Sequence, residues 1–240
     1  PVSLYKWLTR KYQEGKVSFK NVEVYSIDEY YPYGKGEPQS RNKILHTSLL
    51  NAVDIKEENI HIPDGSVPGD KISAYCEEYD KMARNLDMLV IGMGEAGQVG
   101  FNEAGTTPSS RTRTVLLSYQ SRKRQGKNFN GDFKHTPSEA ITVGIDTMMS
   151  AKKIILMAWG EDKANAVKQV VEHKADSDFP ASFLQNHKDI TCYVDETAAS
   201  LLTRVVSPWL VGPCEWTRKF IRKAVVWLCQ EVHKPILKLT

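Results

Sequence analysis

Short apolar runs alternate with amphipathic stretches along most of the chain. Runs of β-favouring residues predict strands at 22–27, 60–62, 88–91, 140–144, 154–159 and 190–194. Amphipathic stretches predict helices at 2–13, 41–50, 69–86, 162–173 and 198–204. Strands that alternate with helices are typical of βαβ units. We therefore expect an α/β fold, a three-layer sandwich with a mostly parallel, Rossmann-like sheet.

The final segment has a different pattern, which predicts a basic helix over 217–232. One face of this helix carries Phe220, Ala224, Leu228 and Val232. We expect that face to pack on the domain or on a neighbouring one. Binding to a membrane surface is the weaker alternative, because few positive charges follow Lys223. The predicted organisation is a domain at 1–205 and a helical extension at 206–240 that leads to a further domain.

Composition and charge exclude several classes of protein. The 240 residues are 41% hydrophobic and 25% charged, which is typical of a soluble globular domain. The longest apolar runs have six residues, whereas a membrane span needs about 20. A formal net charge of +3 is too small to indicate nucleic-acid binding by itself. We expect neither a membrane nor a nucleic acid as a partner.

The cysteines and histidines form no recognisable chemical motif. The four cysteines, at 76, 192, 214 and 229, include no CxxC pair, and we expect reduced thiols in the core. The six histidines show no HxxxH or HExxH spacing, so the sequence predicts no metal site. No secretory signal is visible, and together these features favour a cytoplasmic location.

A glycine-rich turn follows the strand predicted at 88–91. Residues Gly92 to Gly97 fit the GxGxxG pattern, which makes a dinucleotide-dependent dehydrogenase one hypothesis. The acid expected about 20 residues further on is represented only by Glu103, which comes too early, and the intervening residues are poor helix formers. We expect no cofactor here. The turn can still present backbone N–H groups to an anionic or polyhydroxylated ligand.

Ligands of parallel α/β sheets bind at the carboxyl ends of the strands. The residues that follow strands here are Asp28 and Glu29, the glycine turn, and residues 160–163. A basic segment at 111–134 adds seven Lys and Arg residues with one acid. Three explanations of this segment stay open: a solvated face, a site for a sugar phosphate or phosphorylated effector, and a nucleic-acid patch. The last is the weakest, because aromatic residues do not alternate with the charges.

Several elements together resemble the glucosamine-6-phosphate deaminase family. They are Ser-Ile-Asp-Glu-Tyr at 26–30, the block at 92–103, Ser-Arg-Thr-Arg at 110–113, Thr-Val-Gly at 142–144, the stretch at 160–164, and 182–185 with Asp195 and Glu196. Their order and spacing match the family from residue 1 to about 205. In the family, a first strand and a GGTP-type phosphate loop precede the helix that matches the one predicted at 2–13. The resemblance therefore implies that this chain lacks both.

The resemblance implies conversion of glucosamine 6-phosphate into fructose 6-phosphate and ammonia. Asp28 matches the family's base, and a carboxylate can take a proton from C2 and return it at C1. Lys163 matches a phosphate-binding lysine, and Lys127 stands where the family has an arginine. The other expected substrate-binding residues are Glu29, Gly92, Gly94 and Gly97. Homo-oligomers occur in the family, so a homo-oligomer is a candidate assembly.

The sequence departs from the family at the residues for ring opening. The family uses a histidine held by an aspartate and a glutamate. Glu103 supplies the glutamate, but Ala96 and Gln98 stand where the aspartate and histidine should be. Gln98 can hydrogen-bond a ring oxygen but cannot titrate near neutral pH. With Asp28, Gln98 and Glu103 are the expected catalytic residues.

Three alternatives remain open after this departure. Ring opening is left to solution or to Glu103, the substrate is a different sugar phosphate, or the domain is a sugar-phosphate-binding or regulatory module without turnover. The family's allosteric site is also in doubt, because Val115 replaces a lysine.

Overall fold

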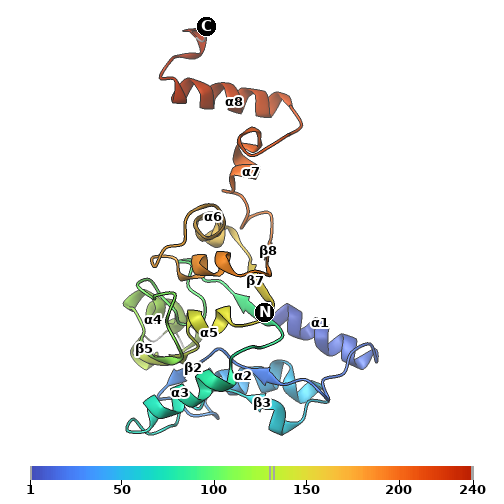
Figure 1. Ribbon diagram of the computed structural model, residues 1–240, viewed down its shortest axis with the longest axis vertical. Coiled ribbons are helices and arrows are strands. Elements are labelled where there is room, and N and C mark those ends of the chain that lie inside the picture. The colour runs from blue at the N-terminus through green and yellow to red at the C-terminus, as the bar shows by residue number, and fades with distance from the viewer. Residues whose placement is uncertain (1, 130, 132, 239–240) are drawn as a thin grey trace.

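A computed structural model describes residues 2–129, 131 and 133–238 (Figure 1). The helices are α1 (Val2–Gln13), α2 (Arg41–Ser48), α3 (Ile72–Met82), α4 (Tyr119–Gln125), α5 (Ile145–Met149), α6 (Ala164–Glu172), α7 (Thr203–Val206) and α8 (Arg218–Glu231). The strands are β1 (Val24–Tyr25), β2 (Asp28–Tyr31), β3 (Ile60–His61), β4 (Leu89–Gly92), β5 (Arg113–Leu116), β6 (Glu139–Thr142), β7 (Ile154–Ala158) and β8 (Ile190–Val194). Helices and strands alternate as the sequence pattern predicts.

Three small sheets form in the described part of the chain. β4, β7 and β8 make a parallel sheet with β7 in the middle, and β1 pairs with β3 in parallel. β2, β6 and β5 make an antiparallel sheet with β6 in the middle. The predicted three-layer α/β architecture with mostly parallel pairing is confirmed. The antiparallel unit around β6 is an addition that the sequence pattern does not indicate.

The main core lies on one face of the β4-β7-β8 sheet. On β7, Ile154, Leu156 and Ala158 are at most 2% exposed, whereas the alternate residues Ile155 and Met157 are half-buried. Successive strand side chains point to opposite faces, so one face of β7 is covered more completely than the other. Helix α6 contributes Ala166, Val167 and Val170 to the same cluster.

Three predicted elements differ in extent from the structure. The strand predicted at 22–27 is shorter, because pairing with β3 covers only Val24 and Tyr25, and the antiparallel pairing with β6 begins at Asp28, beyond the predicted strand. The helix predicted at 69–86 is shorter at both ends, and Asn85 has a left-handed backbone with φ of 57° just beyond α3. The helix predicted at 198–204 is wrong, because turns cover 196–201 and only α7 is helical.

Several short elements were not predicted. Among them are β5, α4 and α5, besides β2 at residues expected to follow a strand, and none exceeds seven residues. Elements this short carry too few apolar positions to show a period of 2 or 3.6.

The carboxyl-terminal extension stands apart from the body of the molecule (Figure 1). Helix α8 has no buried residue. An aromatic cluster holds the extension together through Trp216, Phe220 and Trp227, whose ring centroids lie 6.1–6.4 Å from that of Trp209. Leu228 and Val232 remain 41% and 43% exposed. The expected packing of this helix face on the preceding domain is therefore absent from the described residues. No helix in that part of the chain is long and apolar enough to cross a membrane.

The thiols are free, but not all lie in the core. Cys76 is buried on α3, and burial raises the pKa of its thiol to about 11. Cys192 is exposed on β8, an edge strand of the parallel sheet, although it shares a face with Ile190 and Val194, which pack against the main core. The prediction of core thiols therefore holds for Cys76 and is wrong for Cys192.

We expect Leu156→Ala to destabilise the protein strongly. Leu156 is 1% exposed in the middle strand of the parallel sheet, and truncation of a buried leucine lowers the free energy of unfolding by about 2–5 kcal/mol. Leu201→Ala is the matched control, since Leu201 is 43% exposed. Urea unfolding monitored by circular dichroism measures both variants. Equal midpoints for the two would contradict the core assignment.

Candidate active site

The candidate site begins on β2, where Asp28 and Glu29 are neighbours. Side chains of adjacent strand residues point to opposite faces, so the two carboxylates have different surroundings. Asp28 pairs with Thr142 of β6 in the antiparallel register. Both residues therefore lie within β2, not in a loop after a strand as the sequence pattern predicts.

Asp28 carries a partly exposed carboxylate held from one side. Its Oδ1 accepts a hydrogen bond of 2.9 Å from Nε of Arg41, and the Asp28 side chain is 13% exposed. Burial alone would lower the pKa of the Arg41 guanidinium, but the charges of Asp28, Tyr30 and Glu29 and the hydrogen bond to Asp28 together outweigh burial, and the pKa lies above its ordinary value. Arg41 therefore stays charged. The sequence analysis missed this residue, and nothing in its spacing pointed to it.

Glu29 faces the interior and is 1% exposed. Its carboxylate accepts four hydrogen bonds from the amides of Tyr30, Arg41 and Asn42 and from the hydroxyl of Ser40, at 2.7–3.1 Å. Three of these donors lie at the start of α2, where the helix dipole favours an anion. Glu29 therefore fixes the start of α2 to β2. Its expected contact with substrate has no support in this geometry.

The glycine-rich segment passes beside Asp28. The amide of Phe101 donates to Oγ1 of Thr142 at 3.1 Å, and Thr142 lies opposite Asp28 in the register. Gly100 has φ of 57°, and a Cβ at this position would lie 2.9 Å from Thr142 Oγ1 and 3.7 Å from Asp28 Oδ2. Glycine is required there for both backbone and space. The structure thus brings together two of the predicted site elements, Asp28 and the glycine segment.

Gln98 folds back onto the turn. Its side-chain Oε1 accepts the amide N–H of Ala96 at 3.0 Å, and its backbone carbonyl accepts that of Gly94 at 2.9 Å. A Cβ on Gly94 would collide with the Gln98 amide at 2.1 Å. Gly97 donates to the Gly94 carbonyl and accepts from Ala181, whereas Gly92 ends β4. The side chain of Gln98 therefore stabilises the turn.

The turn does not open a helix. Residues 93–112 form turns, bends and isolated bridges before β5 begins. A dinucleotide fingerprint needs a helix directly after the glycines, because the helix N-terminus holds the pyrophosphate. The hypothesis of a dinucleotide-dependent dehydrogenase therefore loses its structural basis.

The two carboxylate oxygens of Glu103 differ in their hydrogen bonds. Oε2 accepts the amide N–H of Ser118, the N-cap of α4, at 3.1 Å. Oε1 is buried and has no hydrogen-bond partner in the described part of the chain. A buried carboxylate oxygen without a hydrogen-bond donor destabilises the folded state, so a ligand with a donor group would be stabilised at this atom.

The two lysines expected to bind phosphate lie on different elements. Lys163 ends the 3₁₀ helix η5 (Glu161–Lys163) directly before α6, and its ammonium pairs with the carboxylate of Asp162. This pairing lowers the pKa of Asp162. Lys127 is exposed on the 3₁₀ helix η3 (Gly126–Asn128). Among the described residues, neither lysine forms a hydrogen bond or ion pair with Asp28.

Much of the basic segment at 111–134 is committed to internal contacts. Nη1 of Arg124 pairs with Oε1 of Glu95 at 2.5 Å, which ties α4 to the glycine turn. Arg113 bonds the Asn102 side chain at 3.1 Å, and Arg122 bonds the carbonyl of Thr136 at 3.0 Å. These arginines are positioned by the fold, so a freely solvated face is the wrong description for them.

Arg111 belongs to a buried network around Asp80 of α3. Asp80 is 1% exposed and accepts hydrogen bonds from Arg111, from the amide and hydroxyl of Thr112, and from the Thr147 hydroxyl. Burial alone would raise the pKa of this carboxyl, but the donors, Thr147 foremost, lower it to about 2. The first arginine of the Ser-Arg-Thr-Arg element therefore has a structural partner.

The phenols around Asp28 stay protonated at neutral pH. Burial raises the pKa of Tyr30 to about 12. Burial, with the charge of Asp28 as the next cause, also raises the pKa of Tyr5 on α1. In this neighbourhood Asp28 is the better candidate for a base.

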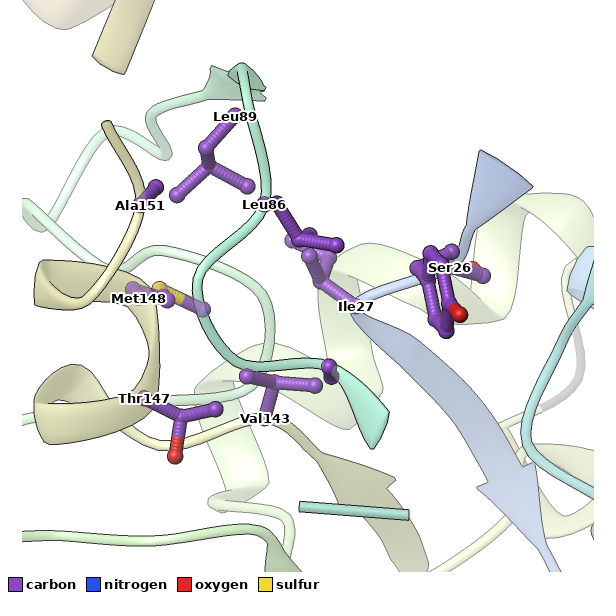
Figure 2. Close-up of a pocket in the computed structure, with 10 residues that line it drawn as sticks. Ser26, Ile27, Leu86, Leu89, Val143, Thr147, Met148 and Ala151 are labelled. Atoms are coloured by element: carbon purple, nitrogen blue, oxygen red, sulfur yellow. The ribbon is translucent and has the colours of Figure 1, made fainter. Parts of the chain in front are cut away.

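A small apolar cavity lies beside β1 and β4 (Figure 2). Its volume is about 10 Å³, and it is lined by Ile27, Leu86, Leu89, Val143, Met148 and neighbouring residues. That volume holds about one water molecule, so this cavity is too small for a sugar phosphate. Among the described residues, no group of three or more His, Cys, Asp or Glu could hold a metal ion.

Comparison with known proteins identifies the class. The model of the family described as glucosamine-6-phosphate isomerases/6-phosphogluconolactonase matches residues 1–193, and these are enzymes that act on sugar phosphates. The chain belongs to this family.

Three relatives show how far the similarity extends. A glucosamine-6-phosphate deaminase-like protein of Bacteroides thetaiotaomicron is 42% identical over 100% of this chain, which spans 36% of that protein's length. Glucosamine-6-phosphate deaminase 2 of Bacillus subtilis is 37% identical over 84% of this chain and 82% of its own length. The solved structure of a monomeric glucosamine-6-phosphate deaminase superimposes with a TM-score of 0.80 at 34% identity, over 84% of this chain and 83% of its own.

The Asp80 network predicts a specific loss of stability in acid. The folded pKa of about 2 lies below the unfolded value of about 3.9. The stabilisation from the ionised carboxylate is therefore complete above about pH 4 and disappears as the pH falls towards 2. Its size is on the order of 2 kcal/mol.

Asp80→Asn removes this titration, and we expect a flatter dependence of the free energy of unfolding on pH between 5 and 2. Urea unfolding at each pH measures it. Asp87→Asn is the control, since the Asp87 side chain is 89% exposed. An acid dependence of Asp80→Asn equal to that of the unchanged chain would contradict the network's role.

Proposed function

We propose that this chain is a glucosamine-6-phosphate deaminase-like enzyme that acts on the ring-opened form of an amino-sugar phosphate. One observation carries the proposal: Asp28, at the position of the family's base, presents a partly exposed, oriented carboxylate beside the glycine segment. The named relatives at 37–42% identity support the same activity.

The chemistry needs one base that serves twice. Asp28 takes the proton from C2 of the open-chain aldehyde while the C1 oxygen gains a proton, which gives an enolamine. Asp28 then returns the proton to C1, and the nitrogen on C2 becomes an iminium. Water adds to C2 and ammonia leaves, which yields fructose 6-phosphate. No net oxidation or reduction occurs, so the reaction requires no redox partner.

In this mechanism the sugar ring opens spontaneously in solution, without catalysis by the protein. Gln98 is bound to the turn backbone and cannot titrate, and Glu103 lacks the imidazole that its family counterpart holds. Loss of a general acid typically lowers a rate by about 10²–10⁴-fold. The enzyme would then be limited by the supply of open-chain substrate.

We propose that Lys163 binds the phosphate group of the substrate. Lys163 lies directly before α6, where the helix dipole favours an anion. Its ammonium would exchange Asp162 for the phosphate. Lys127, exposed on η3, is the second candidate and would contribute a point charge without the bidentate geometry of arginine.

A second candidate function is a sugar-phosphate-binding or regulatory module without turnover. The unpartnered Oε1 of Glu103 and the inward-folded Gln98 favour it, because a ring-opening site that has lost its histidine would leave this glutamate without a donor. The following experiments separate the two functions.

The family model matches residues 1–193, which supports a boundary between domain and extension. The Bacillus relative matches 84% of this chain and the Bacteroides relative matches all of it. We propose that residues 1–205 form the domain shared with the shorter deaminases, and that 206–240 connect it to a further domain.

Asp28→Asn should strongly reduce ammonia release from glucosamine 6-phosphate. The amide keeps the size of the side chain but cannot accept the C2 proton, so we expect a fall in kcat of about 10²–10⁴-fold. Asp178→Asn is the control, because Asp178 is exposed and outside the site. A coupled glutamate dehydrogenase assay measures ammonia. Turnover by Asp28→Asn at the original rate would overturn the assignment of the base, and binding without any turnover by the unchanged chain would favour the regulatory module.

The double substitution Ala96→Asp with Gln98→His should raise turnover. The variant restores the histidine and aspartate that the family pairs with this glutamate, whose Oε1 has no partner here, so the imidazole would act as the acid for ring opening and a gain of about 10²-fold is expected. Each single variant serves as a control, and circular dichroism reports whether the turn survives loss of the Gln98 contact. No gain in a folded double variant would contradict the view that these two positions limit the rate.

A further inference from the structure

We propose that Arg41 is a positioning residue that holds the Asp28 carboxylate in one orientation, with Oδ1 bound and Oδ2 left to exchange the proton. The inference concerns a residue outside the family motifs and rests on the proposed role of Asp28 as a base.

The contact between the two side chains is direct and partly desolvated. Nε of Arg41 donates to Oδ1 of Asp28 at 2.9 Å, and the two side chains are 27% and 13% exposed. Charge-assisted hydrogen bonds of this length are among the stronger ones in proteins, and shielding from water strengthens them further. Arg41 can therefore restrict rotation of the carboxylate.

Arg41 is itself fixed through its backbone. Its amide N–H donates to Oε1 of Glu29 at 3.0 Å, and Glu29 is the strand neighbour of Asp28. Two consecutive carboxylates of β2 thus hold one arginine: Glu29 holds its main chain, and Asp28 holds its side chain. Because both anchors belong to the same strand, the arginine and the base move as one unit.

Two aromatic rings fix the plane of the guanidinium. Its central carbon lies 5.1 Å from the ring centroid of Tyr30 and 5.6 Å from that of Phe101. Tyr30 belongs to β2, whereas Phe101 belongs to the glycine segment. Cations above aromatic rings at these distances are attracted by the ring quadrupole. Arg41 therefore joins β2, α2 and the glycine segment at a single point.

This geometry divides the work between the two oxygens of Asp28. Oδ1 is taken by Arg41, and Oδ2 faces Gly100, where even a Cβ would come within 3.7 Å. No hydrogen bond to Oδ2 is present in the described part of the chain, so this oxygen is available to a substrate proton. Once Oδ2 has taken the proton, the guanidinium faces a neutral carboxyl group. The unpaired positive charge then favours release of the proton to C1, and the carboxylate is restored.

Two variants and a matched control test the proposal. Misplacement of a catalytic group by about 1 Å can cost on the order of 10²-fold, and we expect Arg41→Ala to lower kcat by that factor with little change in KM. Arg41→Lys keeps the charge without the planar fork and should retain part of the rate. Added guanidinium ion should partly restore the kcat of Arg41→Ala. No such rescue is expected if Arg41 only stabilises the fold.

Arg84→Ala is the control for loss of a half-buried ion pair. The Arg84 side chain is 28% exposed, and it pairs with Asp146 at 2.9 Å. Its thermal stability should fall about as far as that of Arg41→Ala while its kcat remains unchanged. Equal losses of kcat in the two variants, or full kcat in Arg41→Ala, would overturn the proposal.

A spectroscopic arm separates failure of this inference from failure of the proposed function. The arginine Nε–H signal that disappears from the ¹⁵N–¹H spectrum of Arg41→Lys belongs to Arg41. We expect this signal to be protected from solvent exchange in the unchanged protein and to lose protection in Asp28→Asn. If the unchanged protein releases no ammonia but shows the protected signal, the proposed function fails while the hold of Arg41 on Asp28 stands. A signal with the same exchange rate in both proteins overturns the inference, whatever the kinetics show.

Discussion

The arrangement around the candidate site depends on one buried carboxylate. Glu29 takes four hydrogen bonds and is almost completely removed from solvent. Burial of a carboxylate is costly unless donors replace water, and here the first turn of α2 supplies most of those donors. The helix therefore starts where it can satisfy Glu29, and its first residue is Arg41. The surroundings of Asp28 follow from this constraint.

A second constraint sits on the opposite strand. Thr142 of β6 faces Asp28 in the register and accepts the amide N–H of Phe101. This contact draws the glycine segment onto the antiparallel sheet, although the segment leaves β4 of the parallel sheet. The site thus lies where the two kinds of sheet meet. Neither sheet alone contains both Asp28 and the turn.

The sequence predicted those features that depend on local pattern. Helix α1 has the predicted bounds, and the parallel strands β4, β7 and β8 lie within one or two residues of their predicted positions. The family elements led to Asp28 and to the glycine segment, which the structure brings together. What the pattern could not predict depends on contacts distant in sequence. The contact of Arg41 with Asp28 spans 13 residues, and that of Thr142 with Phe101 spans 41. The inward folding of Gln98 was missed for a different reason, since an amide serves a backbone N–H as well as it serves a ligand.

The aromatic cluster of the extension has a consequence for optical spectroscopy. The chain has five tryptophans. Three of them lie close together at the carboxyl end, where Trp216 and Trp227 each contact Trp209. The other two, Trp7 and Trp159, are 53% and 49% exposed. Native indole emission from the body of the molecule therefore comes from half-exposed rings, while the extension contributes rings that pack on one another, one pair stacked and one edge-on. Tryptophan fluorescence of this protein is thus chiefly a local reporter of the carboxyl-terminal extension, and the parallel sheet contributes through Trp159, which directly follows its middle strand β7.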